Sequence, residues 1–356
     1  MSRSKRKLDH IDYALSTGFS TSNSFDDIRF VHNSLPSISF SEVDFSTTIG
    51  ELTMSSPIII NAMTGGGGLE TENINRRLAA AARETNTVMA VGSQMSAIKR
   101  PEESNTYRAV RQEIGTGLVF ANLGSEATPD QAQQAVEMIE ADALQIHLNV
   151  VQELVMPEGD RDFKGALQRM EAIASTINVP VIVKEVGFGL SRETVQRLWN
   201  AGISIVDTGG KGGTNFSSIE NKRRDEPYSF FDEWGLTAAA SIAEARTVSP
   251  QISIIGSGGV RHGADIAKAI AMGADACGMA GKMLSAVSES GTEGAVQFIR
   301  RCQQELAVVM TALGAASVSD LKRCPLIIDN QTHHWLSERG IDTKAFGLRD
   351  SSLDPD

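Results

Sequence analysis

Short apolar runs alternate with longer amphipathic segments along most of the chain, from Pro57 onward. The apolar runs have the length of buried strands, and the amphipathic segments repeat apolar residues at the helical period. The candidate strands are Pro57–Asn61, Val88–Gly92, Leu118–Asn122, Ala143–Asn149, Val181–Glu185, Ile203–Asp207, Ile252–Gly256 and Ala276–Met279. The main helical patterns are Thr71–Thr85, Pro129–Ile139, Phe163–Thr176, Arg192–Asn200, Thr237–Thr247, Ala264–Met272 and Glu293–Leu313.

Eight strand–helix units over roughly 250 residues are typical of a single (β/α)8 TIM barrel, an α/β fold. A doubly wound open sheet is the alternative, but no G-x-G-x-x-G fingerprint follows the first strand. The pattern therefore predicts three parts. Residues 1–56 form an N-terminal extension, residues 57–314 form the barrel, and residues 315–356 form a C-terminal arm.

One candidate strand departs from the apolar rule. In Ala143–Asn149, the polar residues Gln145, His147 and Asn149 alternate with apolar ones. Strands of α/β proteins are normally apolar on both faces, and buried polar groups cost free energy unless they have partners. The strand leads into a loop with Gln152 and Glu153. Such a strand end is typical of a barrel active site, and the alternative is a strand whose polar face is solvated.

Glycine-rich segments follow the last three candidate strands. The first ends in Thr214, the second contains Gly258, Gly259, Val260 and Arg261, and the third contains Ala280 and Gly281. Glycine lets backbone N–H groups approach a phosphate, and barrels commonly bind phosphate at the loops after strands seven and eight. Tight-turn packing alone is the competing interpretation. The pattern predicts a phosphate site.

Other strand ends suggest what carries this phosphate. Lys184 is expected at the barrel mouth, where it needs an anionic partner. The N1–C2=O edge of a reduced flavin and a nearby carboxylate are the two candidates. Asn122 and Ser93 can hydrogen-bond the same ring system. Three residues after strand one are expected along its face: Ala62, Met63 and Thr64. Together these features favour FMN over a sugar phosphate.

The charge balance narrows the range of partners. The 356 residues include 33 Lys and Arg against 44 Asp and Glu, a net charge of −11. Nucleic-acid binding needs a basic surface, so it is not expected. No apolar run reaches the about 20 residues of a membrane span. The three cysteines are widely spaced, which fits a reducing, cytoplasmic setting. The basic start, residues 3–7, is either a solvated tail or a segment that closes over an anion.

The motifs resemble those of the type 2, FMN-dependent isopentenyl-diphosphate isomerases. The match runs from residue 6 to about residue 281 and is most specific at QxHLNxxQExxMPEGD, residues 145–160. The other matching motifs are RKxxH (Arg6, Lys7, His10), MTGG (63–66), GSQ (92–94), ANLG (121–124), KExGxG (184–189), GGxGGTxF (209–216), GSGGxR (256–261) and AG (280–281). The resemblance implies interconversion of isopentenyl and dimethylallyl diphosphate, with FMN, Mg2+ and NADPH or another reductant. It also implies a homotetramer or homo-octamer.

The resemblance also implies roles for single residues. Glu153 would ligate Mg2+, while His147, Asn149 and Gln152 would orient the substrate as the catalytic set. Gln152 is an amide and does not titrate near neutrality, so reduced flavin is the better candidate for the proton carrier. The substrate would be bound by Arg6, Lys7, His10, Ser93, Gln94, Met95, Asn149 and Gln152. Of these, Arg6, Lys7 and His10 would pair with the diphosphate.

One position departs from the family pattern, because some members carry arginine where this chain has Met95. A side-chain contact from that position to diphosphate is therefore in doubt. Two other functions stay open from sequence. One is an FMN-dependent 2-hydroxy-acid oxidase or dehydrogenase, and the other is a non-catalytic flavin-binding scaffold.

Overall fold

The computed structural model describes residues 23–63, 66 and 68–350. The expectations for Arg6, Lys7, His10 and Thr64 lie outside the described residues. No helix in the described ranges is long and apolar enough to cross a membrane.

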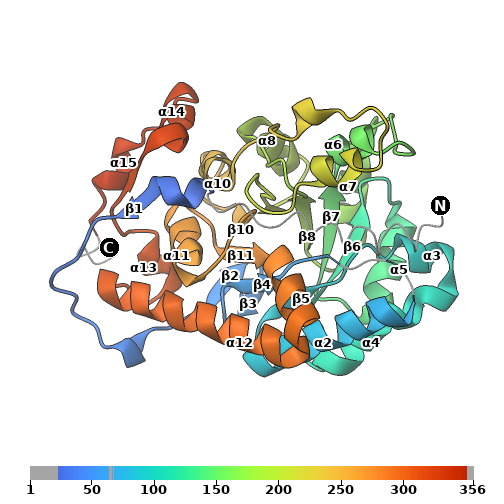
Figure 1. Ribbon diagram of the computed structural model, residues 1–356, viewed down its shortest axis with the longest axis horizontal. Coiled ribbons are helices and arrows are strands. Elements are labelled where there is room, and N and C mark those ends of the chain that lie inside the picture. Colours follow the sequence, from blue (N-terminus) through green and yellow to red (C-terminus); the bar gives the residue numbers. More distant parts are fainter. Residues whose placement is uncertain (1–22, 64–65, 67, 351–356) are drawn as a thin grey trace.

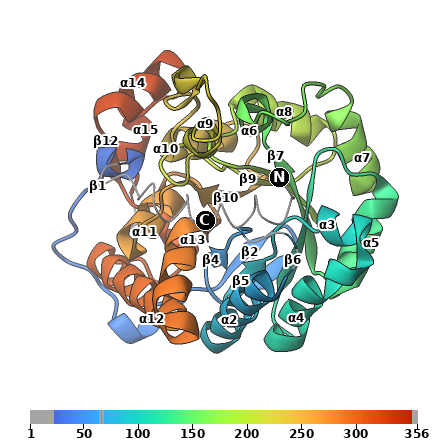
Figure 2. The same ribbon diagram turned by 45° about the vertical axis from the view of Figure 1, so that its right-hand side comes forward.

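Eight parallel strands close into a barrel, and helices surround it (Figures 1 and 2). The strands are β4 (Ile58–Ile60), β5 (Val88–Ala90), β6 (Val119–Gly124), β7 (Ala143–Leu148), β8 (Val181–Glu185), β9 (Ile205–Asp207), β10 (Ser253–Ser257) and β11 (Ala276–Met279). Each strand pairs with its neighbour in sequence, and β11 pairs with β4 to complete the ring. The predicted (β/α)8 fold is confirmed, because all eight candidate segments form the barrel strands.

The α-helices are α2 (Leu69–Thr85), α3 (Met95–Lys99), α4 (Asn105–Ile114), α5 (Pro129–Ile139), α6 (Val150–Val155), α7 (Ala166–Thr176), α8 (Arg192–Asn200), α9 (Phe216–Asn221), α10 (Ala238–Arg246), α11 (Gly263–Ala271), α12 (Gly281–Leu313), α13 (Val318–Leu321), α14 (Asn330–Glu338) and α15 (Lys344–Gly347). Short 3-10 helices are η1 (Ser24–Asp27), η2 (Phe40–Glu42), η3 (Pro101–Ser104) and η4 (Ser229–Phe231). Helix α12 starts before its predicted bound and is broken at Ser290 and Gly291, which have non-helical dihedrals.

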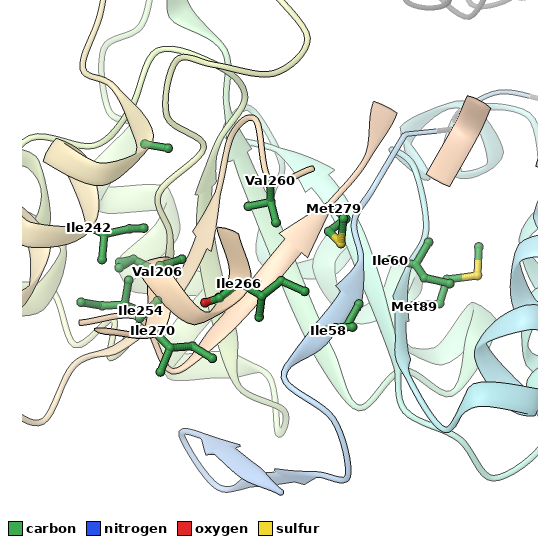
Figure 3. Packing of buried hydrophobic residues seen from close by; sticks show 14 of the residues in the cluster. Ile58, Ile60, Met89, Val206, Ile242, Ile254, Val260, Ile266, Ile270 and Met279 are labelled. Carbon is green, nitrogen blue, oxygen red and sulfur yellow. The ribbon is translucent and has the colours of Figure 1, made fainter. Parts of the chain in front are cut away.

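The strands separate two apolar regions. Alternate residues such as Ile58 and Ile60 point outward and pack against the helices (Figure 3). Ile59 points inward, into a smaller cluster inside the barrel. This inner cluster also holds Ile49 and Met54 from the hairpin of β2 (Thr47–Ile49) and β3 (Leu52–Met54). Apolar side chains therefore fill one part of the barrel interior, and the polar residues of the strand ends lie beyond it.

The N-terminal extension and the C-terminal arm meet beside the barrel. Strand β1 (Ile28–Phe30) pairs antiparallel with β12 (Leu326–Ile328). Figures 1 and 2 show β1 close to the arm helices α14 and α15. The proposed domain limits stay predictions, but the two ends of the described chain share one small sheet.

Candidate active site

Two cavities are lined by residues that follow the carboxyl ends of the barrel strands. The first, here called the glycine cavity, is lined by Asn61, Ala62, Met63, Lys184, Thr214, Gly258, Gly259, Val260, Arg261, Ala280, Gly281 and their neighbours. The second, here called the polar cavity, is lined by Ser93, Met95, Lys99, His147, Asn149, Gln152, Glu153 and their neighbours. Since both lie at the carboxyl ends of parallel strands, they belong to the face where barrel enzymes place their active sites.

Two glycine loops form one wall of the glycine cavity by packing backbone against backbone. Gly258 and Gly259 have φ values of +109° and +77°, which side-chain-bearing residues rarely adopt. A Cβ on Gly258 would lie 1.9 Å from the Gly210 carbonyl oxygen, and one on Gly259 would lie 2.4 Å from that of Gly212. Only glycine fits here, so the cavity wall consists of bare backbone.

Helix α12 begins at the same cavity. Its first residue is Gly281, and the preceding Ala280 supplies no side-chain cap. The first N–H groups of a helix have no partner within the helix, and the helix dipole favours an anion beside them. The helix start and the backbone wall together fit the phosphate of FMN.

Arg261 also borders this cavity, but its guanidinium is engaged by carboxylates. Its Nη2 lies 2.6 Å from Asp26 Oδ1, and its Nε lies 2.8 Å from Asp265 Oδ2. Hydrogen bonds from these two carboxylates raise the pKa of the guanidinium further. The side chain therefore anchors η1 to the loop after β10, and a cofactor contact from Arg261 stays a prediction.

A buried polar network fills the barrel interior between the cavities. Lys184 Nζ lies 3.2 Å from Asp207 Oδ2. Asp207 is fully buried and also accepts hydrogen bonds from Asn61 Nδ2, at 2.6 Å, and from Ser257 Oγ. Of the two partners expected for Lys184, the structure shows the carboxylate. The ammonium still borders the glycine cavity, where it can also meet an anionic ring edge.

The network continues along the polar strand β7. Gln145 Nε2 donates to Asn61 Oδ1 at 3.1 Å, and Asn122 Nδ2 donates to Gln145 Oε1 at 3.2 Å. Asn122 Oδ1 in turn lies 3.0 Å from His147 Nδ1. Gln145 is fully buried, so the solvated-face interpretation of this strand is wrong at that residue. The hydrogen bonds run from Lys184 in the glycine cavity to His147 in the polar cavity.

The loop and helix after β7 hold the polar cavity together. Asn149 Nδ2 donates to Glu153 Oε1 at 2.9 Å and lies 3.4 Å from Gln152 Oε1. Gln152 Nε2 donates to Glu220 Oε1 on α9 at 3.1 Å. Glu220 is fully buried and also receives a hydrogen bond from Arg223. The amide of Gln152 is thus held in one orientation.

Glu153 has the chemistry of a Mg2+ ligand. Its Oε1 accepts from Asn149 and its Oε2 accepts from the Asp160 N–H at 2.8 Å, which fixes the carboxylate while each oxygen retains a lone pair. Among the described residues, no cluster of three or more His, Cys, Asp or Glu side chains could hold a metal. Mg2+ commonly binds one or two carboxylates, with water and substrate phosphate as its other ligands. The site fits that mode.

The residues after β5 take different positions. Ser93 borders the polar cavity and not the glycine cavity, and its carbonyl accepts a hydrogen bond from the Tyr107 hydroxyl at 2.6 Å. Met95 borders the same cavity, but only 2% of its surface is exposed. Gln94 points away. Its Nε2 donates to the Ala135 carbonyl at 2.9 Å and its Oε1 accepts from the Asn122 N–H, so the side chain has a structural position. A substrate contact from the Gln94 backbone stays a prediction.

Asp207 and Glu220 were not among the candidate site residues. Asp207 ends an otherwise apolar strand, a position that resembles that of Lys184 and is a usable signal. Glu220 has no such signal, because it lies on a short helix six residues past Thr214 and is buried only by the tertiary fold.

Comparison with known proteins identifies the family. Residues 97–327 match the family model of FMN-dependent dehydrogenases. An isopentenyl-diphosphate delta-isomerase of Geobacillus sp. is 54% identical over 98% of this chain and 100% of its own length. One of Bacillus licheniformis is 55% identical over the same shares.

Solved structures share the fold at low identity. Flavocytochrome b2 superposes with a TM-score of 0.67 and 17% identity, over 98% of this chain and 89% of its own. A lactate oxidase from Pediococcus acidilactici gives 0.65 and 16%, over 90% and 87%. These likenesses show the barrel fold only. The full-length sequence matches decide the family, and the chain belongs to the FMN-dependent isopentenyl-diphosphate delta-isomerases.

Proposed function

We propose that this enzyme interconverts isopentenyl diphosphate and dimethylallyl diphosphate with reduced FMN and Mg2+, and that NADPH serves as the reductant. The observation that carries the proposal is the pairing of two cavities at one barrel end, joined by the hydrogen bonds from Lys184 to His147. One cavity has a backbone cradle for a phosphate, and the other has a fixed carboxylate for a metal.

The glycine cavity would hold FMN. Gly258, Gly259 and the start of α12 would meet its phosphate, and Ala62 and Met63 would line the ring. Lys184 would place positive charge at the ring edge, while Asp207 keeps that ammonium in place. When bound in its reduced form, FMN supplies acid–base chemistry at its N5 region.

The polar cavity would hold the diphosphate end of the substrate. Glu153 would ligate Mg2+, which would supply positive charge for the diphosphate end of the substrate. His147, Asn149 and Gln152 would orient the substrate through hydrogen bonds. Gln152 presents one fixed amide orientation because Glu220 holds its Nε2. An amide orients but does not titrate, so Gln152 is assigned a positioning contact with the substrate.

The isomerisation has no net redox change, since a proton is added to one end of the allylic unit and another is lost from the other end. The reductant therefore prepares the enzyme and is not consumed in each turnover. We further propose that the protein is cytoplasmic and assembles as a homotetramer or homo-octamer.

A turnover assay under four conditions tests the proposal. Oxidised and reduced FMN enzyme is supplied with isopentenyl diphosphate, each with and without Mg2+, and the allylic product is measured. Product is expected only from reduced enzyme with Mg2+. Equal product from oxidised, metal-free enzyme overturns the proposal. Oxidation of 2-hydroxy acids such as lactate, without isomerisation, would establish the rival oxidase function.

A further inference from the structure

The polar cavity has an unfavourable charge for a diphosphate. Two of its lining side chains in the described chain are the cations Lys99 and Arg169. The carboxylates that line it are Glu126, Glu153, Glu158, Asp160 and Asp162. An anionic substrate head in such a cavity needs cations that are free to face it, even with a metal bound to Glu153.

Arg169 is directed at backbone instead. Its Nε donates to the Ser125 carbonyl at 2.9 Å, and its Nη1 donates to the Lys164 carbonyl at 3.1 Å. These contacts pin the start of α7 to the loop after β6. These contacts fix the Arg169 guanidinium against backbone carbonyls at the edge of the cavity.

Lys99 differs from Arg169 in this respect. It is exposed, it borders the polar cavity, and within the described ranges its ammonium has no ion pair or hydrogen bond. It ends the short helix α3, four residues after Met95, so the two residues share one face of that helix. Met95 is apolar and nearly buried, whereas the lysine reaches the same cavity with a charge.

We propose that Lys99 binds the diphosphate of the substrate and supplies the cation that the apolar Met95 cannot. This inference rests on the proposed function. An ammonium is a compact point charge and a common phosphate ligand. Its long stem lets it follow the diphosphate without a fixed geometry. Ser93 lines the same cavity and offers a hydroxyl. Lys99 is therefore a binding residue, so its loss acts on substrate affinity and leaves the reacting carbons in place.

Kinetics of three variants test the proposal. Lys99→Met should raise KM for isopentenyl diphosphate about 10-fold, the order expected for one charged hydrogen bond, while kcat changes less than about 2-fold. Lys99→Arg keeps the charge and should stay within about 3-fold of the wild-type KM. Lys164→Met is the matched control, because it removes an exposed lysine that does not line the cavity. An unchanged KM in Lys99→Met, or an equal rise in Lys164→Met, overturns the proposal.

Calorimetric titration separates this inference from the proposed function. Inorganic diphosphate with Mg2+ is titrated into the FMN-loaded wild type and into FMN-loaded Lys99→Met. Weaker binding to the variant, by about 10-fold, supports the lysine contact even if the wild type shows no isomerase turnover. Equal affinity for both proteins, or no binding to the wild type, refutes the contact whatever the turnover result.

Discussion

Gln152 Nε2 donates a hydrogen bond to Glu220 Oε1 over 3.1 Å, which joins the helix after β7 to the helix after β9. An amide can rotate to exchange its nitrogen and oxygen, and this carboxylate selects one of the two orientations. Glu220 itself is fully buried and paired with Arg223, so the orientation is set by a rigid partner.

We expect Glu220→Ala to lower kcat on the order of 10-fold or more, because Gln152 would no longer face the substrate in one orientation. Glu220→Gln keeps a similar shape and an acceptor oxygen, so it should retain more activity than Glu220→Ala. The check is kcat and KM together with bound flavin per subunit. Equal kcat in wild type and Glu220→Ala would show that Gln152 needs no such support.

Glu153→Gln should sharply raise the Mg2+ concentration needed for half-maximal activity and leave FMN bound. The amide lacks the negative charge that a hard cation prefers. Glu126→Gln is the matched control, since Glu126 is a carboxylate that lines the same cavity. Loss of flavin with a normal Mg2+ dependence would show that the residue has been given the wrong role.

Gly258→Ala should release FMN, because its Cβ would lie 1.9 Å from the Gly210 carbonyl oxygen and force the two glycine loops apart. Gly202→Ala controls for backbone strain. Gly202 also has a positive φ, +81°, but nothing lies within 4 Å of an added Cβ. Flavin absorbance per mole of purified protein measures the outcome. Full flavin content in Gly258→Ala would mean that the loops do not form the cradle.

The buried carboxyl of Glu185 predicts a pH-dependent stability. Burial raises its pKa to about 7, although backbone N–H groups of Phe188, Gly187 and Gly189 favour the charged form. The folded protein then holds a proton that the unfolded chain releases near the ordinary glutamate pKa of 4.5. The free energy of unfolding that this group contributes is fully present below pH 4.5 and is lost as the pH rises to about 7.

Glu185→Gln keeps an oxygen for those N–H groups and cannot ionise. The melting temperature of the variant minus that of the wild type should therefore rise from about pH 4.5 to pH 7 and stay constant at higher pH. Melting curves of the two flavin-free proteins across this range provide the test. Parallel pH profiles would mean that Glu185 is not protonated in the fold.

The periodic parts of the molecule were predictable because local patterns set them. Helix α5 starts at Pro129 as expected, since Thr128 and Gln131 form a capping box around that proline. The part of α12 after its break at Ser290 and Gly291 matches the predicted helix. The part before the break was not predicted, because residues 281–294 are rich in glycine and serine, which weakens the helical pattern.

The connections within the site were not predictable to the same degree. Asn61 and Asp207 are 146 residues apart and meet only because the barrel closes. The direction of the Gln94 side chain was not predictable either. Its motif suggested a substrate contact, yet the side chain turns toward α5. A sequence places such residues at a strand end, but the packing of helices that come later in the chain decides which way they turn.

Deuterium incorporation tests the central claim most directly. Enzyme with reduced FMN and Mg2+ is given isopentenyl diphosphate in D2O under anaerobic conditions, and the products are followed by NMR. We predict dimethylallyl diphosphate that carries solvent deuterium, formed over many turnovers without oxidation of the flavin. Absence of the allylic product, or oxidation of one flavin for each substrate consumed, would contradict the proposed isomerase function.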